Sequence, residues 1–222
     1  MNTTSTAQAL AMDRLYGSQK RLYDLSRRYY LLGREQMIDR VAVAPGARIC
    51  DIGAGTAYYL IQLATKKPQG RYYGIDISAE MLSQAKRNLT KAGLDHKITL
   101  RRNAAEDLSH RADFGLEEPF DAVLLSYCLS MIPESSVQPA IDAAWRNLAP
   151  GGTLYYVDFG PMDAWPTAAR KLFSRWLALY HTVYRPKVIE ALHQLMPRGN
   201  VDLIPLYGGY ALMGIVHKST VE

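Results

Sequence analysis

The sequence is poor in cysteine and has no long apolar run. Its 222 residues contain two cysteines, Cys50 and Cys128, each within an apolar stretch. We therefore expect small core side chains in a reducing cytoplasm, not a disulfide framework. The N-terminus lacks the apolar core of a signal peptide, and uncharged stretches such as residues 203–216 are too short to span a bilayer. A cytoplasmic protein, soluble or peripheral on a membrane, is expected.

Acidic residues are missing from residues 164–189, although the whole chain has 21. This stretch instead mixes Lys and Arg with Trp, Phe and Tyr. Such a segment can lie on an anionic membrane surface, with its aromatic side chains at the level of the headgroups. The alternative is a lid that packs its aromatic side chains on the core. The formal net charge of +5 also favours an anionic partner.

Short apolar runs alternate with helical stretches along the chain. The runs that read as strands cover residues 47–53, 71–77, 98–102, 120–127 and 152–159, and helices are expected from about residues 60, 79 and 137. This alternation predicts an α/β fold with a mostly parallel sheet and helices on both faces. Residues 201–218 contain no helix and predict a terminal hairpin. We expect one domain: a helical cap (1–44), a core (45–158), a helical insertion or lid (159–200) and the strand pair (201–218).

The most informative stretch is CDIGAGTAYYLIQLA (50–64), a strand that runs through glycines into a helix. Glycines let the backbone turn tightly and approach a ligand. A dinucleotide site needs a third glycine where Tyr58 stands, and a P-loop needs a Gly-Lys-Ser/Thr that is absent. Because the turn offers acidic Asp51 and no cation, it favours a neutral or cationic ligand with a nucleoside part.

Asp76 follows 21 residues after Gly55, the position of an acid that accepts hydrogen bonds from ribose hydroxyls. Its alternative role is to cap the next helix, in competition with Ser78.

The order of DIGAGT, GIDISAEMLSQA, NAAEDL, FDAVLLSYCLSMIP and NLAPGGTLYYVDF resembles the class I S-adenosylmethionine-dependent methyltransferases over residues 40–160. The resemblance implies a Rossmann-like fold with seven strands, the last antiparallel, and S-adenosylmethionine as cofactor, with S-adenosylhomocysteine as product. It also implies the cofactor-binding residues, which are Asp51, Gly53, Ala54, Gly55, Thr56, Asp76, Ile77, Met81, Asn103, Ala104, Ala105 and Ser126.

This sequence departs from the family pattern at two places. Ala57 stands where a third glycine is usual. Ala104 stands where the family often has an aspartate near the adenine amine, so Asn103 or Glu106 is expected to take that role.

Two classes of methyl acceptor are disfavoured by missing residues. Enzymes that methylate amino groups of nucleic-acid bases typically have a Pro-Pro-aromatic motif after the fourth strand, where this chain reads SYCL (126–129). Nucleic acid is therefore an unlikely partner. Metal-dependent catechol methylation needs an acidic cluster, and Asp158 has no such companions, so no metal is expected.

The segment RLYDLSRRYYLLGREQMI (21–38) brings tyrosines and arginines close to the glycine turn. If the helix is continuous, Tyr23, Tyr30 and Arg34 share one face with Arg27; Gly33 would otherwise break it. Tyrosines can surround an alkylated ammonium, and an arginine can hold the carboxylate of the cofactor. The alternative is that the tyrosines pack on the domain and the arginines are solvated.

This segment and residues 203–218 look like the N-methyltransferases that make betaine lipids from diacylglyceryl-homoserine, and the YD pair is similar to phosphatidylethanolamine N-methyltransferases. On that basis Arg34 is expected to bind the cofactor, and Tyr23, Asp24 and Tyr127 to be catalytic. The substrate-binding residues would be Tyr30, His181, Tyr207 and Tyr210. Two alternatives remain: a soluble methyltransferase for a small amine or hydroxyl, and a binding module without chemistry.

Overall fold

The protein is described here by a computed structural model that covers residues 30–178 and 184–220. Its centre is a seven-stranded sheet in the order β3-β2-β1-β4-β5-β7-β6. The strands are β1 (Arg48–Ile52), β2 (Arg71–Asp76), β3 (Ile98–Arg102), β4 (Phe120–Ser126), β5 (Leu148–Phe159), β6 (Gly199–Leu206) and β7 (Ala211–Lys218). Strands β1 to β5 are parallel, and β7 runs antiparallel to both β5 and β6. The expected fold class and the terminal hairpin are confirmed.

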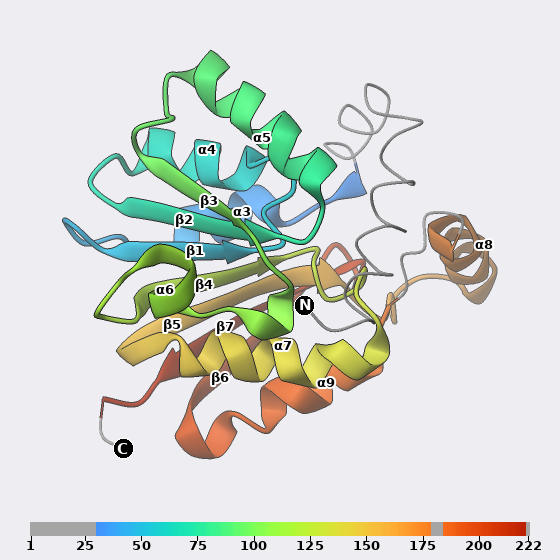
Figure 1. The fold of residues 1–222 in the computed structure, drawn as a ribbon. Coiled ribbons are helices and arrows are strands. Elements are labelled where there is room, and N and C mark those ends of the chain that lie inside the picture. The colour runs from blue at the N-terminus through green and yellow to red at the C-terminus, as the bar shows by residue number, and fades with distance from the viewer. Residues whose placement is uncertain (1–29, 179–183, 221–222) are drawn as a thin grey trace.

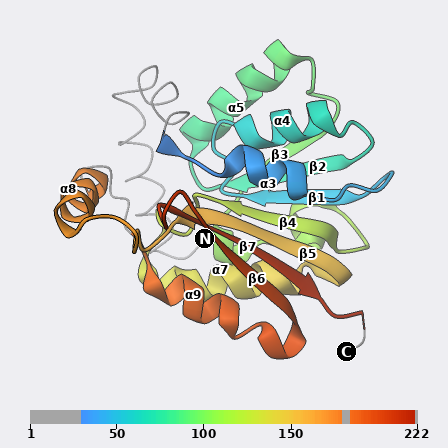
Figure 2. The same ribbon diagram turned by 180° about the vertical axis from the view of Figure 1, so that it is seen from behind.

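Helices cover both faces of the sheet (Figures 1 and 2). One layer is formed by α3 (Arg34–Arg40), α4 (Tyr58–Lys66) and α5 (Ala79–Ala92), and the other by α6 (His110–Phe114), α7 (Glu134–Arg146) and α9 (Pro186–His193). Each layer closes its own apolar core, because alternate strand residues point to opposite faces. Helix α8 (Thr167–Ala178) lies to one side of both layers in both views. In the described residues, no helix has the length and hydropathy needed to cross a membrane.

The ends of the helices follow from their capping residues. Ser78 begins α5, where its Oγ accepts a hydrogen bond from the backbone N–H of Met81 at 3.2 Å, and Gly93 ends it with a left-handed φ of 68°. Gly33 has a left-handed φ of 86°, and the helical conformation is interrupted between Tyr30 and the start of α3. The expectation of a helix that continues through Gly33 to Arg34 is therefore wrong. The alternative, a break at Gly33, is confirmed.

Two expected boundaries are wrong by several residues. Helix α7 begins at Glu134, three residues before the expected start. Strand β5 begins at Leu148, four residues before the expected start at residue 152. The pairing shifts from Phe120–Leu148 to Ala122–Thr153, and Gly151 adopts φ 75°, so the turn residues form an irregularity inside the strand.

Candidate cofactor-binding and active site

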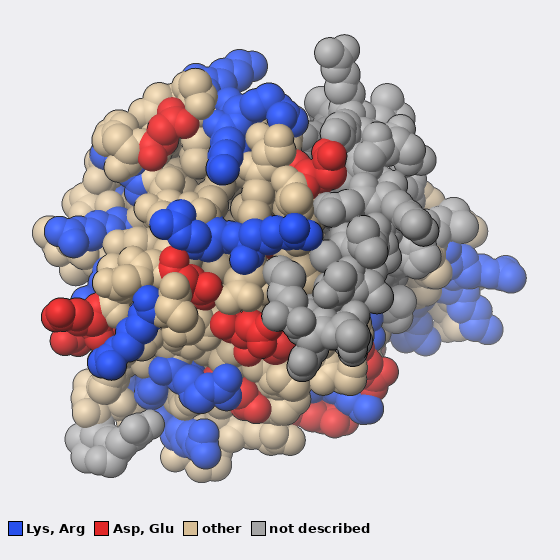
Figure 3. Space-filling model, viewed as in Figure 1, with Lys and Arg blue, Asp and Glu red and all other residues tan. Residues whose placement is uncertain are grey.

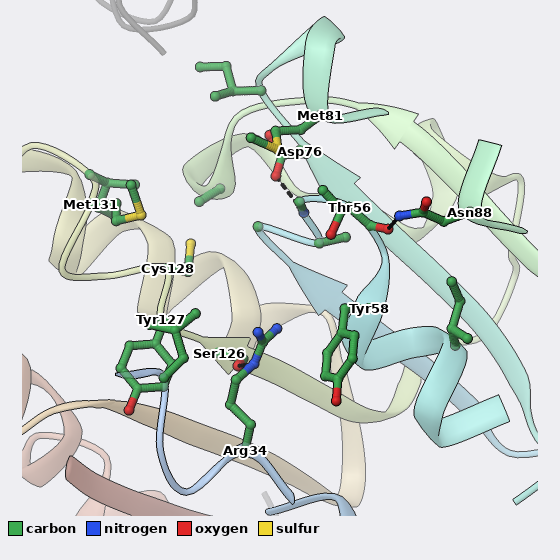
Figure 4. Close-up of a pocket in the computed structure, with 18 of the residues that line it drawn as sticks. Arg34, Thr56, Tyr58, Asp76, Met81, Asn88, Ser126, Tyr127, Cys128 and Met131 are labelled. Atoms are coloured by element: carbon green, nitrogen blue, oxygen red, sulfur yellow. Dashed lines mark hydrogen bonds between the residues drawn. The ribbon is translucent and has the colours of Figure 1, made fainter. Parts of the chain in front are cut away.

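A cavity of about 590 Å³ opens at the carboxyl ends of β1, β2 and β4 (Figure 4). Strand β1 lies between β2 and β4, so the strand order reverses here, the usual ligand position in an open parallel sheet. The cavity brings together most of the expected cofactor residues, namely Arg34, Gly53, Ala54, Gly55, Thr56, Asp76, Ile77, Met81, Asn103, Ala104, Ala105 and Ser126. The adjacent Asp51 is buried behind the turn.

Glycine suits position 53 of the turn because a side chain there would be strained. This residue has φ 76°, and a Cβ there would lie 2.7 Å from Sγ of Cys128. The N–H groups of Gly53 and Ala54 both donate to the carbonyl of Ile75 at 2.9 Å, which ties the turn to β2. Ala57 also has a left-handed φ of 61°, so the chain keeps the conformation of a glycine at this position.

Asp76 ends β2 with its carboxylate fixed by backbone donors. Its Oδ2 accepts from the N–H of Gly55 at 2.7 Å, and its Oδ1 accepts from the N–H of Ser78 at 2.9 Å (Figure 4). Since Ser78 is the residue that caps α5, Asp76 does not have the alternative capping role. A carboxylate held in this way at the cavity wall is prepared to accept ribose hydroxyls, and this role remains a prediction.

Arg34 and Asp51 place opposite charges at the other end of the cavity. The Nε of Arg34 donates to Oγ of Ser126 at 3.1 Å, and its guanidinium carbon lies 5.3 Å from the ring centroid of Tyr58. Burial raises the pKa of Asp51 to about 7, with nearby Asp76 adding to the rise and Arg34 opposing it. Within the described residues, Oδ1 of Asp51 has no hydrogen-bond partner.

This pair fits the zwitterionic end of an amino-acid ligand. A buried carboxylate oxygen without a donor is costly, and an ammonium group would supply both a donor and a compensating charge. Arg34 can hold the carboxylate of the same ligand. Together with Asp76 at the opposite end, these residues fit S-adenosylmethionine, whose methionine and ribose parts carry these groups.

The adenine end differs in detail from the expectation. The side-chain amide of Asn103 donates to the carbonyl of Asp107 at 3.0 Å and to Oδ1 of Asp113 at 2.9 Å. Its oxygen accepts from the N–H of Ala104 at 2.9 Å. Asn103 therefore builds the loop. Glu106 also lines the cavity, and its Oε1 accepts a hydrogen bond from Oγ of Ser136 at 3.1 Å. A contact of either residue with the adenine amine remains a prediction.

Tyr127 lines the cavity with its ring, while its hydroxyl is engaged elsewhere. The hydroxyl donates to the carbonyl of Leu32 at 2.6 Å and points away from Asp76 (Figure 4). Burial raises the pKa of this phenol well above its ordinary value. The ring of Tyr127 thus forms part of the cavity wall, and its expected catalytic role remains a prediction.

Some cavity residues were not predicted from the sequence. Cys128 is a buried core residue like Cys50, as expected, but its sulfur also faces the Gly53 turn and the residue lines the cavity. Apolar Leu31, Met131 and Ile132 join it. Nothing in their spacing separates them from core residues, because they reach the cavity only through the packing of the cap and the β4–α7 connection.

The remaining predicted residues are distributed differently. Tyr23, Asp24 and His181 lie outside the described residues. The Tyr210 hydroxyl donates to the carbonyl of Tyr30 at 2.6 Å, and the Tyr30 ring packs edge-on against Trp176 with centroids 5.2 Å apart. Tyr207 is half-exposed. The residues found to line the cavity do not include Tyr30, Tyr207 or Tyr210, and their substrate roles remain predictions.

Comparison with known proteins agrees with this geometry. Residues 49–152 match the family model described as "Methyltransferase domain". The tRNA N(3)-methylcytidine methyltransferase of Schizosaccharomyces pombe is 25% identical over 162 residues, which are 72% of this chain and 52% of that protein. A demethylmenaquinone methyltransferase of Lactiplantibacillus plantarum is 28% identical over 131 residues, covering 59% of this chain and 52% of that protein. The chain thus spans about half the length of these curated relatives.

Solved structures share the fold across nearly the whole chain. An O-methyltransferase family protein from Burkholderia thailandensis gives a TM-score of 0.72 at 18% identity, covering 93% of this chain and 62% of that one. The structure named "DhpI-SAH complex" gives a TM-score of 0.66 at 16% identity and covers 99% of both chains.

Proposed function

We propose that this protein, whose residues 49–152 match the family model of the methyltransferase domain, transfers a methyl group from S-adenosylmethionine to an amine in a lipid headgroup. The proposal of methyl transfer rests above all on one arrangement. Asp76, the Gly53 turn and the Arg34–Asp51 pair line or adjoin one cavity in the order that the ribose and methionine parts require. The lipid acceptor rests on separate features.

The residues of this chain would hold and orient the reactants. Arg34 pairs with the carboxylate of the cofactor and Asp51 with its ammonium, while Asp76 accepts the ribose hydroxyls. When bound, the cofactor supplies a methyl group activated by an adjacent sulfonium. The apolar side chains of Leu31, Met131 and Ile132 exclude water from the acceptor side. In-line displacement then depends mainly on this positioning.

An amine acceptor must be neutral when it attacks. Its lone pair forms the new N–C bond as the C–S bond breaks. For a primary or secondary amine, a proton then leaves from the methylated nitrogen. The Tyr127 hydroxyl is an unsuitable base because it is buried and already donates to Leu32. The methylated product would release this proton to water after it has left the apolar part of the cavity.

The lipid acceptor is supported by the resemblance to betaine-lipid N-methyltransferases and by the surface around α8. No acidic residue occurs in this helix, and Leu172 is 72% exposed there. A cationic helix with an exposed leucine suits an anionic lipid surface. We therefore propose diacylglyceryl-homoserine, trimethylated to its betaine lipid, as the first acceptor to examine; phosphatidylethanolamine is the next.

A soluble acceptor is the second candidate. The named relatives act on different substrates, and a demethylmenaquinone methyltransferase and an RNA methyltransferase are both among them. An amine or hydroxyl of a small metabolite is compatible with the same cavity.

The test is incubation with methyl-labelled S-adenosylmethionine and a lipid extract, followed by separate reactions with diacylglyceryl-homoserine and phosphatidylethanolamine. The expected result is a lipid that gains mass in successive steps of one methyl. Asp76→Ala is the matched control and should abolish the labelling. Label found only in water-soluble products would refute the lipid acceptor, and no label with any acceptor would contradict methyl transfer.

A further inference from the structure

A second cavity of about 680 Å³ lies between α8 and residues 160–163. It shares no lining residue with the cofactor cavity. We call it the lid cavity. Three cations, Arg170, Lys171 and Arg175, line it, and Tyr184 joins them from the segment before α9. In the space-filling view, Lys and Arg side chains gather over α8 at the right-hand edge of the molecule (Figure 3).

Among the residues that the structure describes, these three cations lack the partners that neighbouring cations have. Lys187 pairs with Glu134 at 2.5 Å, and Nε of Arg185 donates to the carbonyl of Leu129 at 3.1 Å. Within residues 30–178 and 184–220, no side-chain hydrogen bond or ion pair involves Arg170, Lys171 or Arg175. Lys171 and Arg175 are four residues apart on one helix, where like charges repel. An anion between them would relieve this repulsion.

The other walls of the lid cavity indicate what carries the anion. Pro161 and Met162 add apolar surface, and Ser174 and Tyr184 add hydroxyls. Burial, with a further contribution from Asp163, raises the pKa of Tyr184, so its phenol stays a hydrogen-bond donor. The carboxylate of Asp163 also lines the cavity, so that the formal charges of the lining residues sum to +2. The volume greatly exceeds what a bare phosphate needs.

We propose that the lid cavity binds the phosphate group of a phosphomonoester attached to an apolar or bulky group. Arg170 and Arg175 supply forked N–H donors, which suit phosphate oxygens, and Lys171 adds a point charge. The ligand is either a free phosphomonoester or the headgroup of a lipid such as phosphatidic acid. This inference goes beyond the proposed methyl transfer, and its test does not use methyl transfer as a readout.

The test compares two probes that carry the same glycerol phosphate group. Glycerol 3-phosphate is titrated into the full chain by calorimetry. Phosphatidylcholine vesicles with and without phosphatidic acid are then sedimented with the protein. Binding of glycerol 3-phosphate indicates a free ligand, and binding of the phosphatidic acid vesicles alone indicates a lipid.

The triple variant R170Q/K171Q/R175Q should weaken whichever binding is seen by about tenfold or more, because each lost cation removes a charge-assisted hydrogen bond. The control variant R71Q/K86Q/R146Q removes the same charge from exposed positions elsewhere and should bind like the wild type. Undiminished binding of S-adenosylmethionine checks that the triple variant is folded, since the two cavities share no residue. The proposal is overturned if neither probe binds, or if both triple variants lose binding equally.

Discussion

Replacing Asp51 by Asn should make the cofactor-free protein more stable and the cofactor complex weaker. Asp51 is buried, and its pKa rises from an ordinary 3.8 to about 7. Between these values the folded protein binds a proton that the unfolded chain does not. Stability contributed by this group is therefore lost as pH rises through that window. At pH 8 the folded state must hold the carboxylate charged and buried.

The size of the effect follows from the two pKa values. At 1.36 kcal/mol per pH unit, a rise from 3.8 to about 7 corresponds to about 4 kcal/mol as a ceiling. Between pH 5 and pH 8, linkage gives a loss of roughly 2 to 3 kcal/mol in the wild type from this residue. Asp51→Asn removes that loss. Asp158, whose burial raises its pKa to about 6, is present in both proteins and cancels in the comparison.

The assay is urea denaturation of both cofactor-free proteins at pH 5 and pH 8, paired with calorimetry of S-adenosylmethionine binding at pH 8. The stability difference should move in favour of Asp51→Asn as pH rises, while its cofactor affinity falls. Equal pH dependence of the two proteins would refute the burial argument. A variant that binds the cofactor as tightly as the wild type would refute the pairing with the ammonium.

Three further predictions test individual contacts. Arg34→Ala should weaken cofactor binding about tenfold or more in calorimetry, since the loss of a half-buried, hydrogen-bonded charge partner costs more than about 1.4 kcal/mol; unchanged affinity would show that Arg34 does not bind the cofactor. Gly53→Ala should lower the free energy of unfolding by about 2–4 kcal/mol, through left-handed strain and the clash with Cys128. The double variant Gly53→Ala/Cys128→Ala should regain only the stability that the clash removes. Recovery of the full free energy of unfolding would contradict a contribution from backbone strain. Tyr127→Phe should cost about 1–3 kcal/mol in urea denaturation, because the carbonyl of Leu32 loses its donor; a cost equal to that of the control Tyr73→Phe would show that this bond contributes nothing.

The sequence predicts those parts of the site that depend on local chain order. A glycine turn after β1 and an acid after β2 must meet, because parallel strands end at the same edge. Gly53, Gly55 and Asp76 were therefore identifiable from spacing. From the sequence, either Ser78 or Asp76 could cap α5. The geometry of the backbone is needed to assign this role to Ser78.

The rest of the site depends on contacts between distant segments. Cys50 and Cys128 both follow apolar runs, yet the sulfur of Cys128 alone faces the turn. The hydroxyls of Tyr127 and Tyr210 are both bound to backbone carbonyls of the cap, which no periodicity indicates. The irregular start of β5 was also hidden, because its Pro-Gly-Gly residues resemble an ordinary turn.

The two tyrosine hydroxyls have a consequence for the order of assembly. Tyr210 reaches Tyr30 across 180 positions of sequence, and Tyr127 reaches Leu32 across 95. Arg34 lies two residues after Leu32. A nascent chain that has already formed β1, β2 and β4 can thus present the ribose end of the cofactor site. Tyr210 lies between β6 and β7, so the segment before Arg34 gains its second anchor only when this hairpin has formed, whereas the ribose end needs no part of it.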